Sequence, residues 1–396
     1  MKIYADNAAT TEMSKAALDT MVYYLTNVYG NPSSLYTIGQ KAKEELENAR
    51  YDIASVINAE PREIIFTSGG SEADNQALLS AAEIGKKKGK THIISTAFEH
   101  HAVLHSLKRL EKQGFEVTLL PVHENGIIRP EELEAAIRED TCLVTVMTAN
   151  NEIGTIQPIA EIGRICRDRG VLFHTDAVQA VGHIPIDVKA MNIDLLSASA
   201  HKFHGPKGTG FLYARKGVAL TNLIEGGAQE RGKRAGTENL AGVMSMAAAL
   251  KETSAAMEKN SKKMSAVRDY LIKGLSEIPH CALNGDAKMR LPGNVNFSFE
   301  GIEGESLLIL LDRKGISASS GSACTSGALD PSHVLLAIGR IHDVAHGSLR
   351  LTIGENATEE EADYIIESVK EIVAHLRSFS PVWRDLTEGK REYILP

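Results

Sequence analysis

Residues 64–75 read IIFTSGGSEADN, a short β-rich run that passes through two glycines into a helical pattern. The same alternation of β-rich runs with amphipathic helical runs, such as 103–113 and 159–168, continues from Glu63 to Arg215. Because parallel strands need helical crossovers, the alternation predicts a large α/β domain with a mainly parallel seven-stranded sheet. The expected strands are IIFTS, HIIST, EVTLL, CLVTVM, VLFHTD, LLSAS and GFLYA.

The C-terminal part of the chain has a different pattern. Residues 238–278 predict two long helices, and a smaller α+β domain follows them. The pattern predicts a large domain at 15–260 and a small domain formed by 1–14 and 261–396. Ser, Gly, Ala and Thr cluster at 320–333, which predicts a mobile segment. The small domain is expected from the strand NVNFSF, the helix ESLLILLDRKG, the strand SLRLTIG and a helix near 358–377.

Composition and charge exclude several classes of protein. Apolar residues make up 43% of the 396 residues and charged residues 24%, which is typical of a soluble globular protein. The net charge of −8 argues against a nucleic-acid groove, which needs clustered Lys and Arg. No apolar run approaches the roughly 20 residues of a membrane span, and the N-terminus MKIYADNAATT lacks the pattern of a signal peptide. We therefore expect a cytoplasmic protein with neither a membrane nor a nucleic acid as partner.

The segment SASAHKFHGPKGTG at 197–210 places Lys202 directly after an expected strand, among small residues, hydroxyls and imidazoles. Ligands of open α/β sheets collect at the carboxyl ends of strands. A lysine that is partly desolvated there, near other cations, has a lowered pKa and can form a Schiff base with a carbonyl cofactor. Taken alone, Lys202 fits an ordinary surface lysine better, and only the neighbouring motifs reverse that preference.

Two of these motifs indicate the rest of a cofactor site. Asp176 ends the strand VLFHTD, where a carboxylate can pair with a protonated pyridine nitrogen. Taken alone, Asp176 fits a helix N-cap or a turn equally well. In 64–75 the helix start offers free N–H groups for a phosphate, with Gly70 and Ser71 as the expected donors. Together with Lys202, these features favour a cofactor of the pyridoxal phosphate type.

The four cysteines lie far apart, without a CxxC pair, so neither a disulfide framework nor a zinc knuckle is expected. Cys142 lies in an apolar strand and Cys166 on an amphipathic helix, and we expect both, with Cys281, to be structural. Cys324 lies in SSGSACTSG, which is no core strand, and is the candidate for chemistry. The histidines lack a consistent metal-ligand spacing, so no metal site is expected.

At this point the chain resembles a known family, the cysteine desulfurases of the NifS and IscS kind, which are class V aminotransferases among the fold type I pyridoxal-phosphate enzymes. The resemblance covers nearly the whole chain. The blocks that carry it are YADNAATT (4–11), GNPSS (30–34), FTSGGSEADN (66–75), EHHAV (99–103), ANNEIGTIQPI (149–159), HTDAVQA (174–180), SASAHKFHGPKG (197–208), RAGTEN (234–239), SSGSACTSG (319–327) and GSLRLTIG (347–354).

The resemblance implies roles for individual residues. Lys202 would bind the cofactor as a Schiff base, Asp176 would pair with its pyridine nitrogen, and His100 would stack on the ring and transfer protons. Arg350 would hold the substrate carboxylate with its bidentate fork, with Asn31 as a second partner. The family pattern further implies that Asn151 and Gln179 contact the cofactor oxygen and ring substituents, and that the phosphate is bound by Gly70, Ser71, Ser199 and His201. It also implies that Thr237 reaches the phosphate of the neighbouring subunit, so a homodimer is expected.

The chain departs from the family pattern at two positions. Tyr36 stands where a histidine is usual, and Thr352 stands where a serine is usual. Neither departure removes a group that the mechanism requires. Both concern contacts around the site, and Asn31 is therefore a weaker assignment than Arg350.

Cys324 separates this group from ordinary aminotransferases. The resemblance implies that its thiolate attacks the sulfur of L-cysteine, which leaves alanine and a persulfide on Cys324. The persulfide would pass to an acceptor protein, such as an iron–sulfur scaffold, and the sequence does not name that acceptor. The alternatives are a selenocysteine lyase on the same scaffold, an aminotransferase, and a sulfur-transfer scaffold in which catalysis is secondary.

Overall fold

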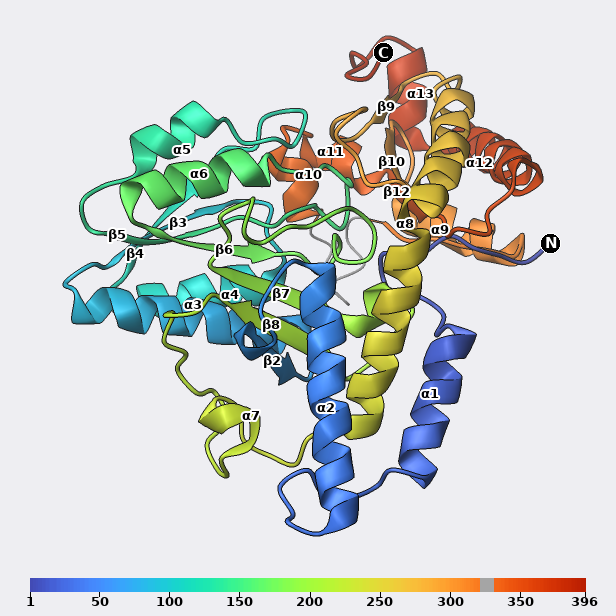
Figure 1. Cartoon of the computed structure of the whole chain (residues 1–396). Coiled ribbons are helices and arrows are strands. Elements are labelled where there is room, and N and C mark those ends of the chain that lie inside the picture. The colour runs from blue at the N-terminus through green and yellow to red at the C-terminus, as the bar shows by residue number, and fades with distance from the viewer. Residues whose placement is uncertain (321–330) are drawn as a thin grey trace.

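The computed structural model describes residues 1–320 and 331–396. Its centre is a seven-stranded sheet with the strand order β2-β8-β7-β6-β5-β3-β4, in which only β8 runs antiparallel to its neighbours (Figure 1). The prediction of a mainly parallel seven-stranded sheet is confirmed. The strands are β2 (Ile64–Thr67), β3 (His92–Thr96), β4 (Glu116–Leu120), β5 (Thr141–Thr145), β6 (Leu172–Asp176), β7 (Leu195–Ser199) and β8 (Gly210–Ala214).

Helices cover both faces of this sheet. Figure 1 shows α5 and α6 on one face and α3 and α4 on the other. Because successive side chains of a strand point to opposite faces, Leu143 packs in the core beneath α3 and α4, and Val144 packs in the core beneath α5 and α6. This two-sided burial explains the nearly continuous apolar runs of the strands. The helices are α3 (Gly70–Lys87), α4 (His101–Glu111), α5 (Pro130–Ala136) and α6 (Ile159–Arg169).

A long helix, α8 (Leu240–Leu275), connects the two ends of the molecule (Figure 1). The prediction of two helices in this stretch is wrong. Good helix formers fill the middle of α8, which contains no proline, so nothing interrupts it. Leu250 packs in the core of the large sheet and Leu271 in the second core, so one rod joins both cores. The helices α1 (Lys15–Thr26) and α2 (Thr37–Val56) pack beside its N-terminal half.

The second core belongs to a smaller α+β unit. Its antiparallel sheet has the order β12-β10-β9, and β1 pairs with β11 in parallel. The strands are β1 (Ile3–Tyr4), β9 (Cys281–Leu283), β10 (Asn294–Phe299), β11 (Ile316–Ser317) and β12 (Ser348–Thr352). The helices that complete the described chain are η1 (Pro61–Glu63), η2 (Ala200–Lys202), α7 (Gln229–Gly232), α9 (Gly304–Arg313), α10 (His333–Ala337), α11 (His342–His346), α12 (Glu359–Phe379) and α13 (Pro381–Thr387).

The division into domains at 15–260, with 1–14 and 261–396 as the small domain, stays a proposal. Its support is that Ile3 and Ala5 pack with the second core, whereas Ala17 packs with the first. The boundary near residue 260 falls inside α8. In the described part of the chain, none of the helices combines the length and the apolar character needed to cross a lipid bilayer.

Candidate active site

A cavity of about 750 Å³ opens at the carboxyl ends of β2, β6 and β7. This is the edge of the sheet where open α/β folds bind their ligands. Side chains from both units and from the N-terminal segment line it. The structure brings together ten of the residues predicted from the sequence, which are Gly70, Ser71, His100, Asn151, Asp176, Gln179, Ser199, His201, Lys202 and Arg350.

Lys202 lies in the single turn η2 that follows β7. Its Nζ donates to the carbonyl oxygen atoms of Ala8 at 2.6 Å and Ala9 at 2.8 Å. His183 donates from Nε2 to the Lys202 carbonyl oxygen at 2.7 Å, which fixes the backbone of the turn. The N-terminal segment therefore orients the amine inside the cavity.

Asp176 ends β6 and is buried at the floor of the cavity. The amide of Val178 donates to its Oδ1 at 2.9 Å, so the turn-capping role open from the sequence is also present. Asp74 of α3 lies beside it and is 1% exposed, and its Oδ1 has no hydrogen-bond partner among the described residues. Burial raises the pKa of both carboxyls, and the charge of Asp176 raises the pKa of Asp74 further.

His100 is the N-cap residue of α4, and its Nδ1 accepts from the amide of Ala102 at 3.1 Å. This bond requires a lone pair on Nδ1, so the neutral ring carries its proton on Nε2. Ligand atoms of His100, Asp74 and Asp176 lie within 4.8 Å of one another. The ring can therefore give or take a proton at Nε2 close to the buried carboxylates.

The first turn of α3 forms a cradle for an anion. Gly70 begins this helix, and the N–H groups of a first helical turn have no partner inside the helix. A Cβ on Gly70 would lie 2.5 Å from Cγ2 of Val178, so no larger residue fits there. His201 completes the cradle from η2, and burial, then the charges of Lys202 and Lys207, lower its pKa to about 4.

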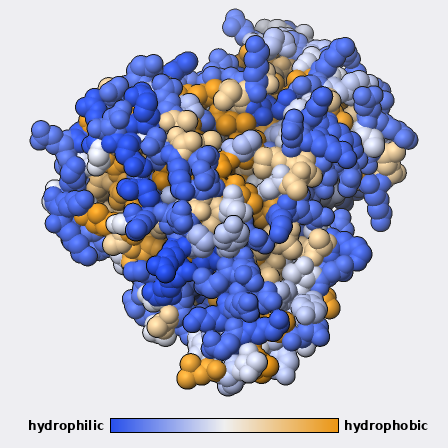
Figure 2. Space-filling view, in the orientation of Figure 1, coloured by the Kyte–Doolittle hydropathy of each residue, from blue (hydrophilic) through white to orange (hydrophobic). Residues whose placement is uncertain are grey.

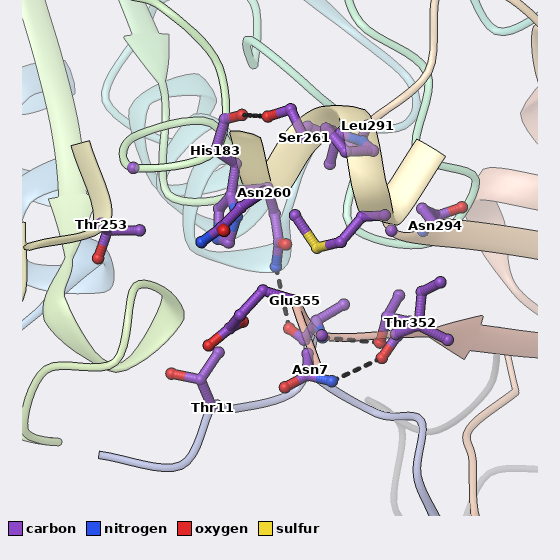
Figure 3. A pocket seen from close by; sticks show the side chains of 18 of the residues that line it. Asn7, Thr11, His183, Thr253, Asn260, Ser261, Leu291, Asn294, Thr352 and Glu355 are labelled. Carbon is purple, nitrogen blue, oxygen red and sulfur yellow. Dashed lines mark hydrogen bonds between the residues drawn. The ribbon is translucent and has the colours of Figure 1, made fainter. Parts of the chain in front are cut away.

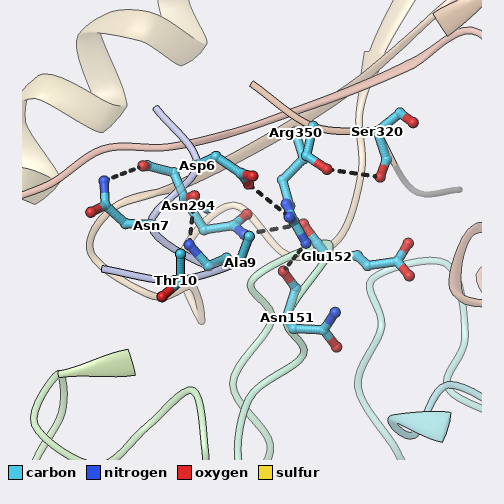
Figure 4. A network of polar contacts seen from close by, with 12 residues as sticks. Asp6, Asn7, Ala9, Thr10, Asn151, Glu152, Asn294, Ser320 and Arg350 are labelled. Carbon is cyan, nitrogen blue, oxygen red and sulfur yellow. Dashed lines mark hydrogen bonds and ion pairs between the residues drawn. The ribbon is translucent and has the colours of Figure 1, made fainter. Parts of the chain in front are cut away.

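Arg350 of β12 lies between the N-terminal segment and the loop after β5 (Figure 4). Its Nη2 pairs with Oδ1 of Asp6 at 2.8 Å, and its Nη1 donates to the carbonyl oxygen of Asn151 at 3.1 Å. Its Nε is buried and has no partner among the described residues. The guanidinium lines the cavity, where it can bind a carboxylate.

Behind the N-terminal segment lies a second, smaller cavity of about 60 Å³ (Figure 3). At its rim the Thr352 hydroxyl accepts from the amide of Ala8 at 2.8 Å, and the side chain of Asn7 donates to the Thr352 carbonyl oxygen at 2.8 Å. Thr352, one of the two departures from the family pattern, thus holds the N-terminal segment in place. The Ala8 carbonyl oxygen of that segment accepts from Nζ of Lys202. A serine has the same hydroxyl, so the departure keeps this contact.

Two of the predicted residues, Asn31 and Thr237, do not line the cavity, and a third lies outside the described residues. Asn31 is exposed, and its Oδ1 accepts from the amide of Ser33 at 2.9 Å. Thr237 is exposed as well, as its assignment to a neighbouring subunit implies. Cys324 and most of the predicted mobile segment lie outside the described residues. Tyr36, the other departure, is 57% exposed.

The structure adds residues that sequence reasoning missed. Asp6 and Asp74 both belong to quoted blocks, YADNAATT and FTSGGSEADN, yet only the fold reveals that one faces Arg350 and the other Asp176. Glu99 is buried beside them and accepts from the amide of Met147 at 3.0 Å, and burial raises its pKa to about 8. No local pattern predicted these partners, because each joins segments far apart in the chain.

The other cysteines lie away from this chemistry. Cys142, Cys166 and Cys281 are buried, and none lines the cavity. Burial raises the pKa of Cys142 and of Cys281 to about 11, and it raises that of Cys166 as well. Because the thiolate is the reactive form, these surroundings make all three poor nucleophiles.

The family model for class V aminotransferases matches residues 3–365, so the chain belongs to that family. The cysteine desulfurase IscS of Clostridium botulinum (strain Hall) is 53% identical over 394 residues, which are 99% of each chain. That similarity makes the chain a member of the cysteine desulfurases within the class. A solved NifS-like protein matches with a TM-score of 0.89 and 39% identity, covering 95% of this chain and 100% of that one. A structure described as SspA in complex with cysteine matches with a TM-score of 0.79 and 34% identity, covering 90% and 100%.

These relatives confirm the expected fold type I architecture, in a family that depends on pyridoxal 5′-phosphate. The cavity fits that group on observations of this chain alone. The first turn of α3, at Gly70 and Ser71, lines the cavity and offers backbone N–H groups to a phosphate. A buried acidic pair, Asp74 and Asp176, lies across the cavity floor from the amine of Lys202 and fits a protonated ring nitrogen.

Proposed function

We propose that this chain is a pyridoxal-phosphate-dependent cysteine desulfurase that converts L-cysteine to L-alanine and carries the sulfur as a persulfide on Cys324. The observation that carries the proposal is the convergence of Lys202, Asp176, His100 and Arg350 on one cavity in a member of this family. A match to a structure that contains cysteine supports the substrate class. In net terms, L-cysteine and the Cys324 thiol give L-alanine and the Cys324 persulfide.

Different residues of the cavity are proposed to bind different parts of the cofactor. Lys202 is the proposed covalent attachment point, Asp176 the partner of the ring nitrogen, and His100 the residue that stacks on the ring. When bound, pyridoxal phosphate supplies an electron sink for the bonds at the substrate α-carbon. Asn151 and Gln179 are proposed for the oxygen and ring substituents, and Gly70, Ser71, Ser199 and His201 for the phosphate.

The chain's own side chains orient the substrate and move its protons. Arg350 binds the carboxylate, and its pairing with Asp6 holds the guanidinium in place before the substrate arrives. His100 exchanges a proton at Nε2, because its Nδ1 is occupied by the amide of Ala102. Lys202, held by the carbonyl groups of Ala8 and Ala9, is the proposed base at the substrate α-carbon. Asn31, as a second carboxylate partner, remains the weakest of these assignments.

The sulfur leaves through Cys324. The thiolate attacks the substrate sulfur, the carbon–sulfur bond breaks, and the carbon is reprotonated to alanine. We propose that a sulfur-acceptor protein, such as an iron–sulfur scaffold, then takes the persulfide sulfur. The relatives are named cysteine desulfurases, which supports the release of sulfur from cysteine.

The test is a visible spectrum of the purified protein, followed by addition of L-cysteine without a keto acid and joint assay of alanine and persulfide. We expect a yellow protein that forms alanine and persulfide in equal amounts in a single turnover without reductant. Lys202→Ala should lose the covalent absorption band. Cys324→Ser should bind cysteine and form no persulfide, whereas Cys281→Ala, a buried control, should behave like the parent.

Four outcomes would contradict the proposal. Alanine formation by Cys324→Ser at the parent rate would remove Cys324 from the mechanism. A requirement for a keto acid would favour an aminotransferase, and a strong preference for selenocysteine over cysteine would favour the lyase. A protein that stays colourless with added cofactor would favour a scaffold in which catalysis is secondary.

A homodimer and a cytoplasmic location also belong to the proposal. Large apolar side chains are exposed on α1, on α2 and on the segment between them, and Figure 2 shows separate hydrophobic residues at the edge of that end of the molecule. Leu35 is 93% exposed and Tyr29 73%, which is costly on a monomer surface and fits a face covered by a second copy. Thr237 would then reach the phosphate of that copy. The side chains of this face are Leu18, Val22, Tyr23, Leu25, Tyr29, Leu35, Tyr36 and Ile38.

A further inference from the structure

Three histidines gather outside the cofactor cavity. His101 and His105 lie four residues apart on α4, with ring centroids 5.2 Å apart. His333 begins α10 and brings its ring to 4.7 Å from that of His101. None of the three lines the cavity that holds Lys202. Residues at i and i+4 share one face of a helix, so α4 presents two imidazoles toward a third from a distant segment.

The hydrogen bond of His333 determines which nitrogen it can offer to a ligand. Its Nε2 lies 2.9 Å from the backbone oxygen of Glu99 and must donate to it, because a carbonyl oxygen only accepts. In the neutral ring the lone pair is therefore on Nδ1. Histidines that bind metals commonly donate their other N–H group to a carbonyl in this way, which orients the ring.

Two of the three ring separations, which His101 makes with His105 and with His333, match the spacing of imidazoles on one metal ion, while the ligand nitrogens of the three rings do not all lie within 4.8 Å of one another. A zinc–nitrogen bond of about 2.0–2.1 Å, with the ring centre roughly 1 Å further out and tetrahedral angles, places imidazole centroids about 5 Å apart. The observed separations are 5.2 and 4.7 Å. Aiming one nitrogen of each ring at a common point needs side-chain rotation, and His105 is exposed and able to rotate.

Two of the rings, those of His101 and His333, favour the neutral form that metal binding needs. Burial, and then the neighbouring histidines, lower the pKa of His101. Burial likewise lowers the pKa of His333. Neutral imidazole is the ligand form, so these rings lose no proton when a metal binds at neutral pH.

We propose that His101, His105 and His333 bind one divalent transition-metal ion, with Zn²⁺ as the natural occupant. Three imidazoles suit zinc, copper or nickel and leave the fourth tetrahedral position to solvent beside the exposed His105. The ion would connect α4 to α10 and leave the residues of the cofactor cavity in place. The acidic group of Asp74 and Asp176 with His100 is not this site, because it belongs to the cofactor cavity.

The test titrates ZnCl₂ into the untagged, cofactor-loaded protein by calorimetry in a non-chelating buffer. We expect one saturable site for each protomer and a rise in Tm with zinc. His105→Ala should weaken binding at least tenfold and abolish the rise in Tm, while the spectrum of the bound cofactor stays unchanged. Because His105 is exposed on a helix, alanine leaves the fold intact.

The matched control is His342→Ala. His342 and His346 form another i, i+4 pair, on α11, with ring centroids 4.4 Å apart. The control should keep the parent affinity. X-ray absorption at the zinc edge should report nitrogen or oxygen neighbours near 2.0–2.1 Å. Sulfur neighbours near 2.3 Å, equal affinity in His105→Ala, loss of affinity in His342→Ala, or no saturable site would each overturn the proposal.

Discussion

Burial disfavours the charged form of both carboxyls at the cavity floor. Asp74 and Asp176 are buried side by side, and the charge of Asp176 raises the pKa of Asp74 beyond the effect of burial. His100 and Lys202 lower the pKa of Asp176 and so favour its charged form. Oδ1 of Asp74 lies 3.6 Å from Nε2 of His174, and burial lowers the pKa of that histidine to about 3, so it offers Asp74 no positive charge at neutral pH. We therefore assign the negative charge of the pair to Asp176 and a proton to Asp74, a hypothesis that two substitutions test.

This assignment predicts different results from two substitutions of the same kind. Asp74→Asn replaces a neutral acid by a neutral amide of the same shape, so cofactor affinity should stay within about threefold and unfolding free energy within about 1 kcal/mol. Asp176→Asn removes the charge and should weaken cofactor binding by at least about tenfold. Absorbance titration of the apoprotein and urea unfolding measure both. Equal losses of affinity in the two variants would contradict the assignment.

At the scale of elements, a buried ion pair attaches α7 to the large sheet. Arg50 of α2 donates to both carboxylate oxygens of Glu230, at 2.8 and 2.9 Å, and both side chains are 2% exposed. The amide of Phe66 in β2 donates to the same carboxylate at 2.9 Å. Glu230 has a φ of 46°, so these three bonds stabilise an unfavourable backbone shape. The pair thereby positions the segment that carries Thr237.

Removing one partner should be costly. Glu230→Gln removes the buried counter-charge of Arg50 and leaves only the half-exposed Glu47, whose Oε1 lies 3.2 Å from Nε, so it should lower the free energy of unfolding by about 3 kcal/mol, measured by urea titration. The double variant Arg50→Met with Glu230→Met should lose less, because no buried charge remains. A Glu230→Gln protein as stable as the parent would show that water reaches this pair.

At the scale of the whole molecule, His204 of the large unit pairs with Glu355 of the small one, with Nε2 and Oε2 3.3 Å apart. The hydrogen bond with Glu355 raises the pKa of His204, and the same bond lowers that of Glu355 to about 2. The histidine's contribution is complete below its unfolded pKa of about 6.5 and is lost as pH rises through the folded value. The glutamate's contribution is complete above about 4.3 and is lost toward pH 2.

The pair should therefore stabilise the protein most between about pH 4.5 and 6.5. We expect Glu355→Gln to lower Tm clearly at pH 6 and much less at pH 9. Scanning fluorimetry across this range measures the difference, with Glu111→Gln on the exposed end of α4 as the control. A Tm difference that does not change with pH would mean that Glu355 acts only by packing.

The exposed apolar face on α1 and α2 predicts that two copies of the chain associate as a homodimer. Leu35→Glu should convert the proposed dimer to a monomer, because a charge at the centre of an apolar interface stays unpaired. Ile309→Glu, at an apolar residue that is 59% exposed on α9, should leave the dimer intact. Sedimentation velocity distinguishes the two results. A parent protein that sediments as a monomer would contradict the homodimer itself.

Much of the fold and part of the site could be predicted from the sequence. The alternation from Glu63 to Arg215 predicted all seven strands of the large sheet, because burial on both faces produces apolar runs of strand length. The same reasoning failed for α8, since helix periodicity cannot tell that one continuous helix passes from the first core to the second. Motif reading predicted ten residues that meet in the cavity and missed Asp6 and Asp74.

The sequence by itself determines the features that depend on residues close to one another along the chain. Strand patterns, the glycine turn before Gly70 and the lysine after β7 depend on neighbours along the chain, so the sequence alone indicated them. Three other contacts depend on the tertiary structure. Asp6 pairs with Arg350, Asp74 lies beside Asp176, and the ring of His333 approaches that of His101. Each joins segments that are distant in sequence, and contacts of that kind exist only after the chain has packed. Tertiary structure alone therefore decided which charges are buried and what each of them faces.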